Sequence, residues 1–281
     1  MVVRRPQRRD AHRRTHRITA RMTTIRLVTR ADDLGSFSGA AAAAVDAHRH
    51  GIIQNAGLMV PTPWFADAAA RVKEAPELCL GLHMTICCEW GQNRWRPLLP
   101  ARQVPSLVGA DGYFHADPVA MHHAGIKPDE ILAECQAQLD RARAHGLDII
   151  YADTHMCWEW MHPLPHGERL SEILPAWCQA NGVLWTARPP AAMLPHPGAT
   201  AHTLQGRLLA QLNVTRPGTY LYVIHPSLHG TGIGQELPGH GAGAIAAERV
   251  ADWRLGRSAV LKAELARRGV TTVRWDALVA A

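Results

Sequence analysis

The sequence predicts an α/β protein: a single-domain (β/α) barrel with about seven parallel strands, TIM-barrel-like and either closed or only partly closed. Short apolar runs alternate with longer helical patterns along most of the chain. Neither a GxGxxG after the first strand nor a GxxxxGK[ST] motif is present, so an open dinucleotide- or nucleotide-binding sheet loses its main support. The 281 residues, 47% of them hydrophobic, suffice for one large core, and the sequence shows no internal repeat.

Several of the expected elements are bounded by a turn or cap signal. Ser38 precedes the first helix and Gly51 follows it, while Pro61 ends the second strand. The expected strands are residues 25–31, 55–60, 78–86, 149–152, 183–186, 220–224 and 270–275. The expected helices are residues 38–50, 64–74, 129–145, 168–179, 203–212 and most of 242–268. Residues 87–125 interrupt the alternation as a long loop rich in glycine and proline, and such loops are usually functional or disordered.

The positive charge of the chain is concentrated at its start. Residues 1–21 carry eight arginines and one acid, for a net charge of +7, whereas the remainder carries −1. This segment lacks apolar periodicity, so we expect residues 1–24 to be a disordered basic tail and residues 25–281 to be the barrel domain. No apolar stretch approaches the roughly 18 to 20 residues that cross a bilayer. Six scattered cysteines without CxxC spacing are typical of reduced thiols, so we expect a cytoplasmic protein.

Polar residues that can perform chemistry follow four of the expected strands. Asp32 and Asp33 end the first strand, His83 the third, His155 the fourth and His225 the sixth. The carboxyl ends of parallel barrel strands meet on one face, which carries the active site. Two histidines and a carboxylate are the ligands of a catalytic zinc ion, although the same trio also holds iron in oxygenases. Each residue alone has a structural explanation, as a turn, a helix cap or a hydrogen-bonded histidine.

Short motifs extend this pattern along the chain. They are residues 31–35 (ADDLG), 56–60 (AGLMV), 81–83 (GLH), 105–108 (PSLV) with 111–114 (DGYF), 153–156 (DTHM) and 225–226 (HP). In order and spacing, from about Ile25 to the end of the chain, they resemble the YdjC-like carbohydrate deacetylases. This group includes chitooligosaccharide and hopanoid-glycolipid deacetylases. Each motif is weakly specific alone, and their shared order makes the resemblance specific.

The resemblance implies a role for each matching residue. Asp33, His83 and His155 would hold one divalent metal ion (zinc, magnesium or cobalt). Asp32 would act as general base, and His225 as general acid or oxyanion stabiliser. An amide is a poor electrophile, and a metal ion both polarises its carbonyl and lowers the pKa of a bound water to about 7. The implied activity is hydrolysis of a linear amide: removal of the N-acetyl group from an acetamido sugar, a glucosaminide or glycolipid, with release of acetate.

The loops after the strands hold several tryptophans. Aromatic faces suit the apolar faces of sugar rings, so substrate-binding candidates are Trp64, Trp90, Trp95 and Trp158. The alternative is that these rings pack the long loop onto the barrel. Many relatives continue the DTH motif with further histidines, whereas residues 156–160 here are MCWEW. This resembles a subgroup with a single histidine and does not imply a chitobiose-type substrate.

Two alternative functions make different predictions. An iron(II) oxygenase using the same trio predicts an antiparallel barrel and a 2-oxoacid partner, against the βα alternation. A nucleic-acid binder would depend on the arginine-rich tail, which a deacetylase does not need. The expected partner is a small carbohydrate or glycolipid rather than nucleic acid or a membrane. A homodimer is expected only by analogy with the family.

Overall fold

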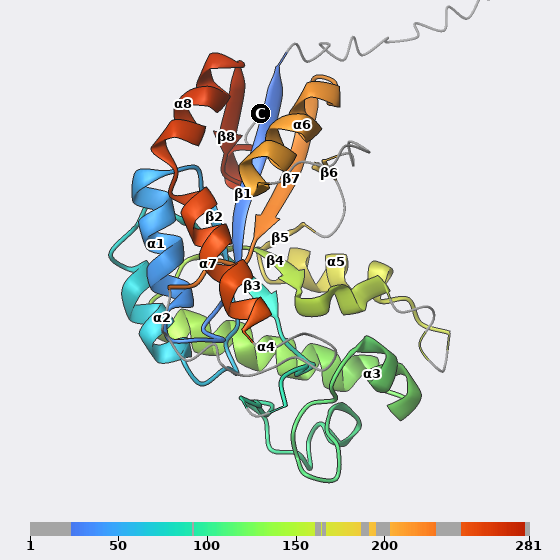
Figure 1. Cartoon of the computed structure of the whole chain (residues 1–281). Coiled ribbons are helices and arrows are strands. Elements are labelled where there is room, and N and C mark those ends of the chain that lie inside the picture. The colour runs from blue at the N-terminus through green and yellow to red at the C-terminus, as the bar shows by residue number, and fades with distance from the viewer. Residues whose placement is uncertain are drawn as a thin grey trace, which may run out of the picture.

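The computed structural model of the chain describes residues 24–91, 93–160, 164, 167–186, 191–194, 203–228 and 243–278. The predicted basic tail, residues 1–24, lies outside the described residues except for Thr24. In the part that is described, one sheet carries the expected alternation of strands and helices, as Figure 1 shows.

All seven predicted strands are confirmed, and a short eighth strand, β6, joins them within the described residues. The order is β5-β4-β3-β2-β1-β7-β6, with β8 paired to the first residues of β1, and every pairing between these strands is parallel. Among the described residues β5 and β6 are not paired with each other, so the barrel is open, which agrees with the partly closed form of the two that the sequence allowed. The strands are β1 (Ile25–Leu34), β2 (Asn55–Leu58), β3 (Cys79–Met84), β4 (Ile149–Thr154), β5 (Leu184–Trp185), β6 (Ala192–Met193), β7 (Gly218–Ile224) and β8 (Val270–Val273).

Helices cover the outside of this sheet, with α1 packed between α2 and α7 along one side (Figure 1). They are α1 (Ala40–His50), α2 (Phe65–Val72), α3 (Pro118–Ala124), α4 (Pro128–Ala144), α5 (Leu170–Ala180), α6 (Leu204–Val214), α7 (Ala244–Gly256) and α8 (Ala259–Arg267). No helix within the described part of the chain is long and apolar enough to span a membrane.

Two helical details differ from the sequence expectation, and both follow from capping residues. The predicted helix over 242–268 is divided into α7 and α8, because the Ser258 hydroxyl accepts the Leu261 N–H and begins a new helix. The long loop also contains α3, which begins where Asp117 accepts the Ala120 N–H before Pro118. This loop and α3 lie at the end of the molecule toward which the strands run (Figure 1).

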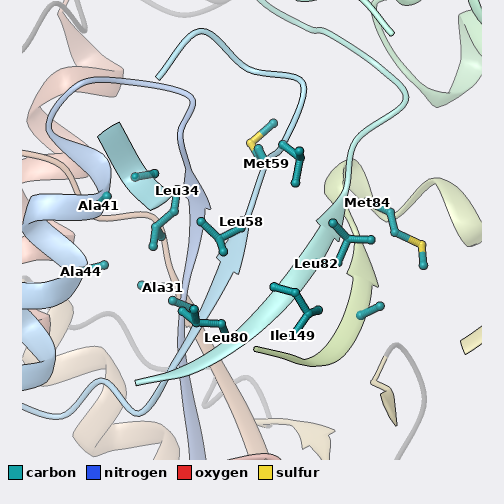
Figure 2. Close-up of a cluster of buried hydrophobic side chains, with 14 of the residues drawn as sticks. Ala31, Leu34, Ala41, Ala44, Leu58, Met59, Leu80, Leu82, Met84 and Ile149 are labelled. Atoms are coloured by element: carbon teal, nitrogen blue, oxygen red, sulfur yellow. The ribbon is translucent and has the colours of Figure 1, made fainter. Parts of the chain in front are cut away.

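The main core lies between the sheet and the helices. Figure 2 shows Ala41 and Ala44 of α1 facing Ala31 and Leu34 of β1, with Leu58 of β2 beside them. These side chains are fully buried or nearly so. The small alanines allow α1 to approach the sheet closely, and the burial of apolar surface holds the strand ends in place.

The inner face of the sheet has a different composition. A small apolar cluster of Val28, Cys79, Tyr151 and Trp275 fills part of the interior. Gly81 makes room for it, because a Cβ there would lie 2.2 Å from the Tyr151 ring. Two residues further along β1 and β4 from Val28 and Tyr151, the inward positions become polar, since side chains alternate with a period of two. The polar residues of the site therefore lie directly next to this packed apolar cluster, toward the carboxyl ends of the strands.

Candidate metal centre

The carboxyl end of β1 is irregular, and this irregularity positions two adjacent carboxylates. Successive residues of a regular strand point to opposite faces. Here the pairing register between β1 and β2 shifts between Ala31 and Leu34, and Asp33 has a left-handed backbone with φ 64°. This conformation is uncommon for a residue with a side chain and marks functional sites. As a result Asp33 turns toward the same group of side chains as Asp32.

The structure brings together the three residues predicted to bind metal. His83 Nε2 lies 3.6 Å from Asp33 Oδ1, and His155 Nδ1 lies 3.3 Å from the same oxygen. All three residues are buried, and their candidate ligand atoms lie within 4.8 Å of one another. Ligand atoms that share one ion at about 2.1 Å lie roughly 3 to 3.5 Å apart. Asp33 Oδ1 is also buried without a hydrogen-bond partner among the described residues, so the trio fits a divalent cation.

Each of these ligands has a second partner on its other polar atom. His83 Nδ1 lies 3.0 Å from Asp153 Oδ1, a neighbour across the β3–β4 pairing. His155 Nε2 lies 2.9 Å from Glu89 Oε2. Metal-binding histidines usually donate their second ring N–H to a carboxylate, which fixes the tautomer and the ring orientation. In each ring the nitrogen nearer to Asp33 is therefore the one that would bind a cation.

A second group of possible ligands, Asp32, His83 and Asp153, lies next to this trio. Arg30 already places a cation there. Its guanidinium lies 2.6 Å from Asp32 Oδ2 through Nη2 and 2.5 Å from Asp153 Oδ2 through Nη1. The arginine side chain is only 8% exposed. We therefore assign this group to an internal ion-pair network that orients Asp32 and Asp153.

The free oxygen of Asp32 faces a small space left by a glycine. Asp32 Oδ1 is buried and has no hydrogen-bond partner among the described residues. A Cβ on Gly57 would lie 3.0 Å from this oxygen and 3.2 Å from His83 Cβ. Any side chain at Gly57 would crowd both groups. The geometry thus leaves one oxygen of Asp32 held by Arg30 and the other available as a proton acceptor.

The site holds opposite charges in close contact. Burial would raise the pKa of Asp33, but the close approach of the His155 and His83 rings and the charge of Arg249 hold it well below its usual range. Burial likewise would lower the pKa of His155, yet the charges of Glu89 and Asp33 raise it to about 9. Burial raises the pKa of Asp32 in spite of Arg30. Without a cation, His155 is therefore protonated at neutral pH and Asp33 is ionised.

This charge state predicts that metal affinity depends on pH. A cation at His155 Nδ1 displaces a proton held with a pKa of about 9, so acid competes with metal. We expect affinity to rise roughly tenfold per pH unit for each displaced proton between about pH 6 and 8. Calorimetric titration with zinc in buffers of different ionisation enthalpy measures the released protons. Affinity that does not change over this range would contradict the assignment of His155 Nδ1.

His225 occupies the position expected of a residue at the end of β7. Ile224, the last residue of β7, pairs with Ala31 of β1, so His225 follows the strand directly beside the Asp32 segment. Its backbone N–H donates to Asp252 Oδ2 of α7 at 2.8 Å, which anchors this turn. Burial raises the pKa of Asp252 to about 7, although Arg249 opposes the shift.

The predicted tryptophans differ in exposure. Trp90, Trp95 and Trp158 are at most 2% exposed, and they pack the loops onto the barrel, the structural alternative raised for them. Trp64 is 44% exposed, and its backbone N–H donates to Gly35 O, two residues after Asp33. Of the four candidates, Trp64 alone is exposed, and its backbone lies next to the turn that follows Asp33.

Three functional candidates escaped the sequence reasoning. Arg30 had one usable signal, because a charged residue in an otherwise buried strand needs a buried partner. Arg249 of α7 lies 3.0 Å from Asp33 Oδ2, more than two hundred residues away in sequence. Glu89 lies in the long loop, where no periodicity marks an inward residue. Only the three-dimensional structure reveals the contact of Arg249 with Asp33 and that of Glu89 with His155.

Curated carbohydrate deacetylases match part of this chain. Carbohydrate deacetylases from Brevibacillus brevis and Geobacillus stearothermophilus are 34% and 33% identical over 131 and 128 residues. These alignments cover 47% and 46% of this chain, and 49% and 48% of the relatives, so about half of each protein is matched.

A crystal structure provides a wider match. A protein from Enterococcus faecalis V583, described as a cellobiose-phosphate cleavage protein, superimposes with a TM-score of 0.68. The superposition covers 91% of this chain and 99% of that one at 18% identity, which shows that the two share a fold. The profile of the YdjC-like protein family matches residues 26–267, almost the whole described barrel, and the chain therefore belongs to the YdjC-like family.

Proposed function

We propose that the protein is a metal-dependent hydrolase that removes the N-acetyl group from an acetamido sugar and releases acetate. The observation that carries the proposal is that His83 and His155 both approach one oxygen of Asp33, which is buried and has no hydrogen-bond partner in the described part of the chain. Carbohydrate deacetylases among the relatives agree with this class of reaction. The parallel pairing of the strands contradicts the antiparallel barrel that the iron oxygenase alternative predicts.

A divalent ion bound by these three residues supplies Lewis acidity to the amide carbonyl and the attacking water. The remaining steps belong to side chains of the protein. Asp32 Oδ1 accepts the proton of the attacking water, because Arg30 holds the other oxygen of that carboxylate. His225 donates a proton to the departing sugar amine, or stabilises the oxyanion, from the end of β7. Hydrolysis then adds one water and yields acetate and a free amine.

The substrate is proposed to be a small carbohydrate or glycolipid. Trp64, at the start of α2, offers an exposed aromatic face, and such faces stack on sugar rings. Trp160, at the end of the turn that follows His155, is 59% exposed and offers a second apolar face. The sugar would stack on one of these rings with its acetamido group directed at the trio.

A direct assay tests this function. The full chain, loaded in turn with Zn²⁺, Co²⁺ or Mg²⁺, is incubated with a panel of N-acetylglucosaminides and acetamido glycolipids, and released acetate is measured. We expect acetate from at least one acetamido sugar and none after chelation of the metal. Full metal occupancy without acetate release from any member of the panel would overturn the proposed substrate class.

A further inference from the structure

We propose that Glu89, in the long loop after β3, is a positioning residue that selects which nitrogen of His155 binds the metal ion. The inference rests on the proposed function, because it deepens the same site. It gives the long loop a definite role in the chemistry. The role is distinct from ligation, since Glu89 is not among the residues whose ligand atoms cluster around Asp33.

The first step is the symmetry between the two histidines. His83 points Nε2 at Asp33 and Nδ1 at a carboxylate, Asp153. His155 does the reverse, with Nδ1 toward Asp33 and Nε2 toward Glu89. Each ring therefore has one nitrogen toward the cation position and one toward a carboxylate. Glu89 thus contacts His155 on the nitrogen that faces away from the cation position, just as Asp153 contacts His83.

The second step is that the two rings need opposite tautomers. A neutral histidine has one N–H donor and one lone pair, and its hydrogen-bond partner decides which nitrogen holds the proton. A carboxylate accepts and cannot donate when ionised, so the nitrogen facing it keeps its proton. Glu89 thus keeps the proton of His155 on Nε2 and leaves the Nδ1 lone pair for the ion.

The third step is that Glu89 is held in place by its neighbours. Trp90 packs edge-on against Phe37, with ring centroids 4.8 Å apart. The Trp95 indole N–H donates to the Cys87 carbonyl at 2.8 Å, and the Cys88 N–H donates to the His115 carbonyl at 2.8 Å. The Glu89 side chain is 12% exposed between these fixed points. A carboxylate fixed in this way orients a ring at little entropic cost.

The test compares metal affinity in three variants of the full chain. Glu89→Ala removes the acceptor, and we expect its zinc affinity to fall about 10- to 100-fold, the usual effect of such an outer partner. Glu89→Gln keeps a neutral carbonyl acceptor and is expected to lie between Glu89→Ala and the wild type. The control is Asp111→Asn, at an exposed carboxylate of the same loop that pairs with Arg94 and accepts the Tyr113 N–H. We expect this control to bind zinc as the wild type does.

A spectroscopic measurement separates positioning from general loosening of the loop. In the zinc-loaded wild type labelled with ¹⁵N-histidine, nuclear magnetic resonance should show His155 protonated at Nε2 with a slowly exchanging proton. In Glu89→Ala we expect that proton signal to broaden or disappear while the His83 signals remain. A His155 protonated at Nδ1 in the wild type would overturn the inference.

The remaining outcomes are also decisive. Wild-type zinc affinity in Glu89→Ala overturns the inference and leaves the proposed function intact. A loss beyond about a thousandfold, with a changed visible spectrum of the Co²⁺ protein, would make Glu89 a ligand and also overturn it. A wild type that binds no metal ion overturns both the inference and the proposed function.

Discussion

Replacing Arg30 with methionine should destabilise the protein by about 3–5 kcal/mol, because it removes the cation that both Asp32 and Asp153 pair with inside the barrel. Methionine fills a similar length of space, so loss of volume contributes little. Denaturant unfolding followed by circular dichroism measures the change, with the slope checked for two-state behaviour. The expected loss is a large fraction of the stability of an ordinary domain.

A matched control and a rescue make this prediction specific. Arg49 forms an exposed pair with Glu74, and Arg49→Met should cost at most about 1 kcal/mol. Combining Arg30→Met with Asp32→Asn and Asp153→Asn should recover part of the loss, because amides need no counter-charge. If Arg30→Met alone cost less than about 1 kcal/mol, the buried network would not have the stabilising role assigned to it.

Replacing Asp32 with asparagine should lower the deacetylation rate by about 10²- to 10⁴-fold, the usual contribution of a general base. The metal ion should still bind, because Asp33 and both histidines are unchanged. Acetate release and zinc affinity measured on the same preparation separate these effects. Asp148→Asn, at an exposed carboxylate before β4, is the control and should retain wild-type rate. A rate within tenfold of the wild type in Asp32→Asn would exclude Asp32 as the base.

The fold was largely predictable because it depends on local and periodic signals. Apolar runs of strand length, separated by capped amphipathic segments, identify each βα unit, and parallel pairing follows from their alternation. The two-residue strand β6 (Ala192–Met193) has no comparable signal, since both residues are exposed at the edge of the sheet. The division between α7 and α8 depends on a single cap at Ser258.

The metal trio was predictable for a related reason. Asp33, His83 and His155 all stand at strand ends, and parallel topology brings strand ends together. Their supporting residues follow no such rule. Glu89 reaches His155 from an aperiodic loop, and Arg249 reaches Asp33 from a helix late in the chain. Exposure was equally unpredictable, because Trp90 and Trp95 fold back into the core while Trp64 stays outside.

Anomalous X-ray diffraction from crystals of the zinc-loaded protein tests the central assignment most directly. We expect one strong peak, bonded at about 2.0–2.3 Å to Asp33 Oδ1, His83 Nε2 and His155 Nδ1. Glu89 and Asp153 should remain hydrogen-bonded to the opposite ring nitrogens. A fully loaded protein whose zinc lies elsewhere, with these three side chains unligated, would contradict the account.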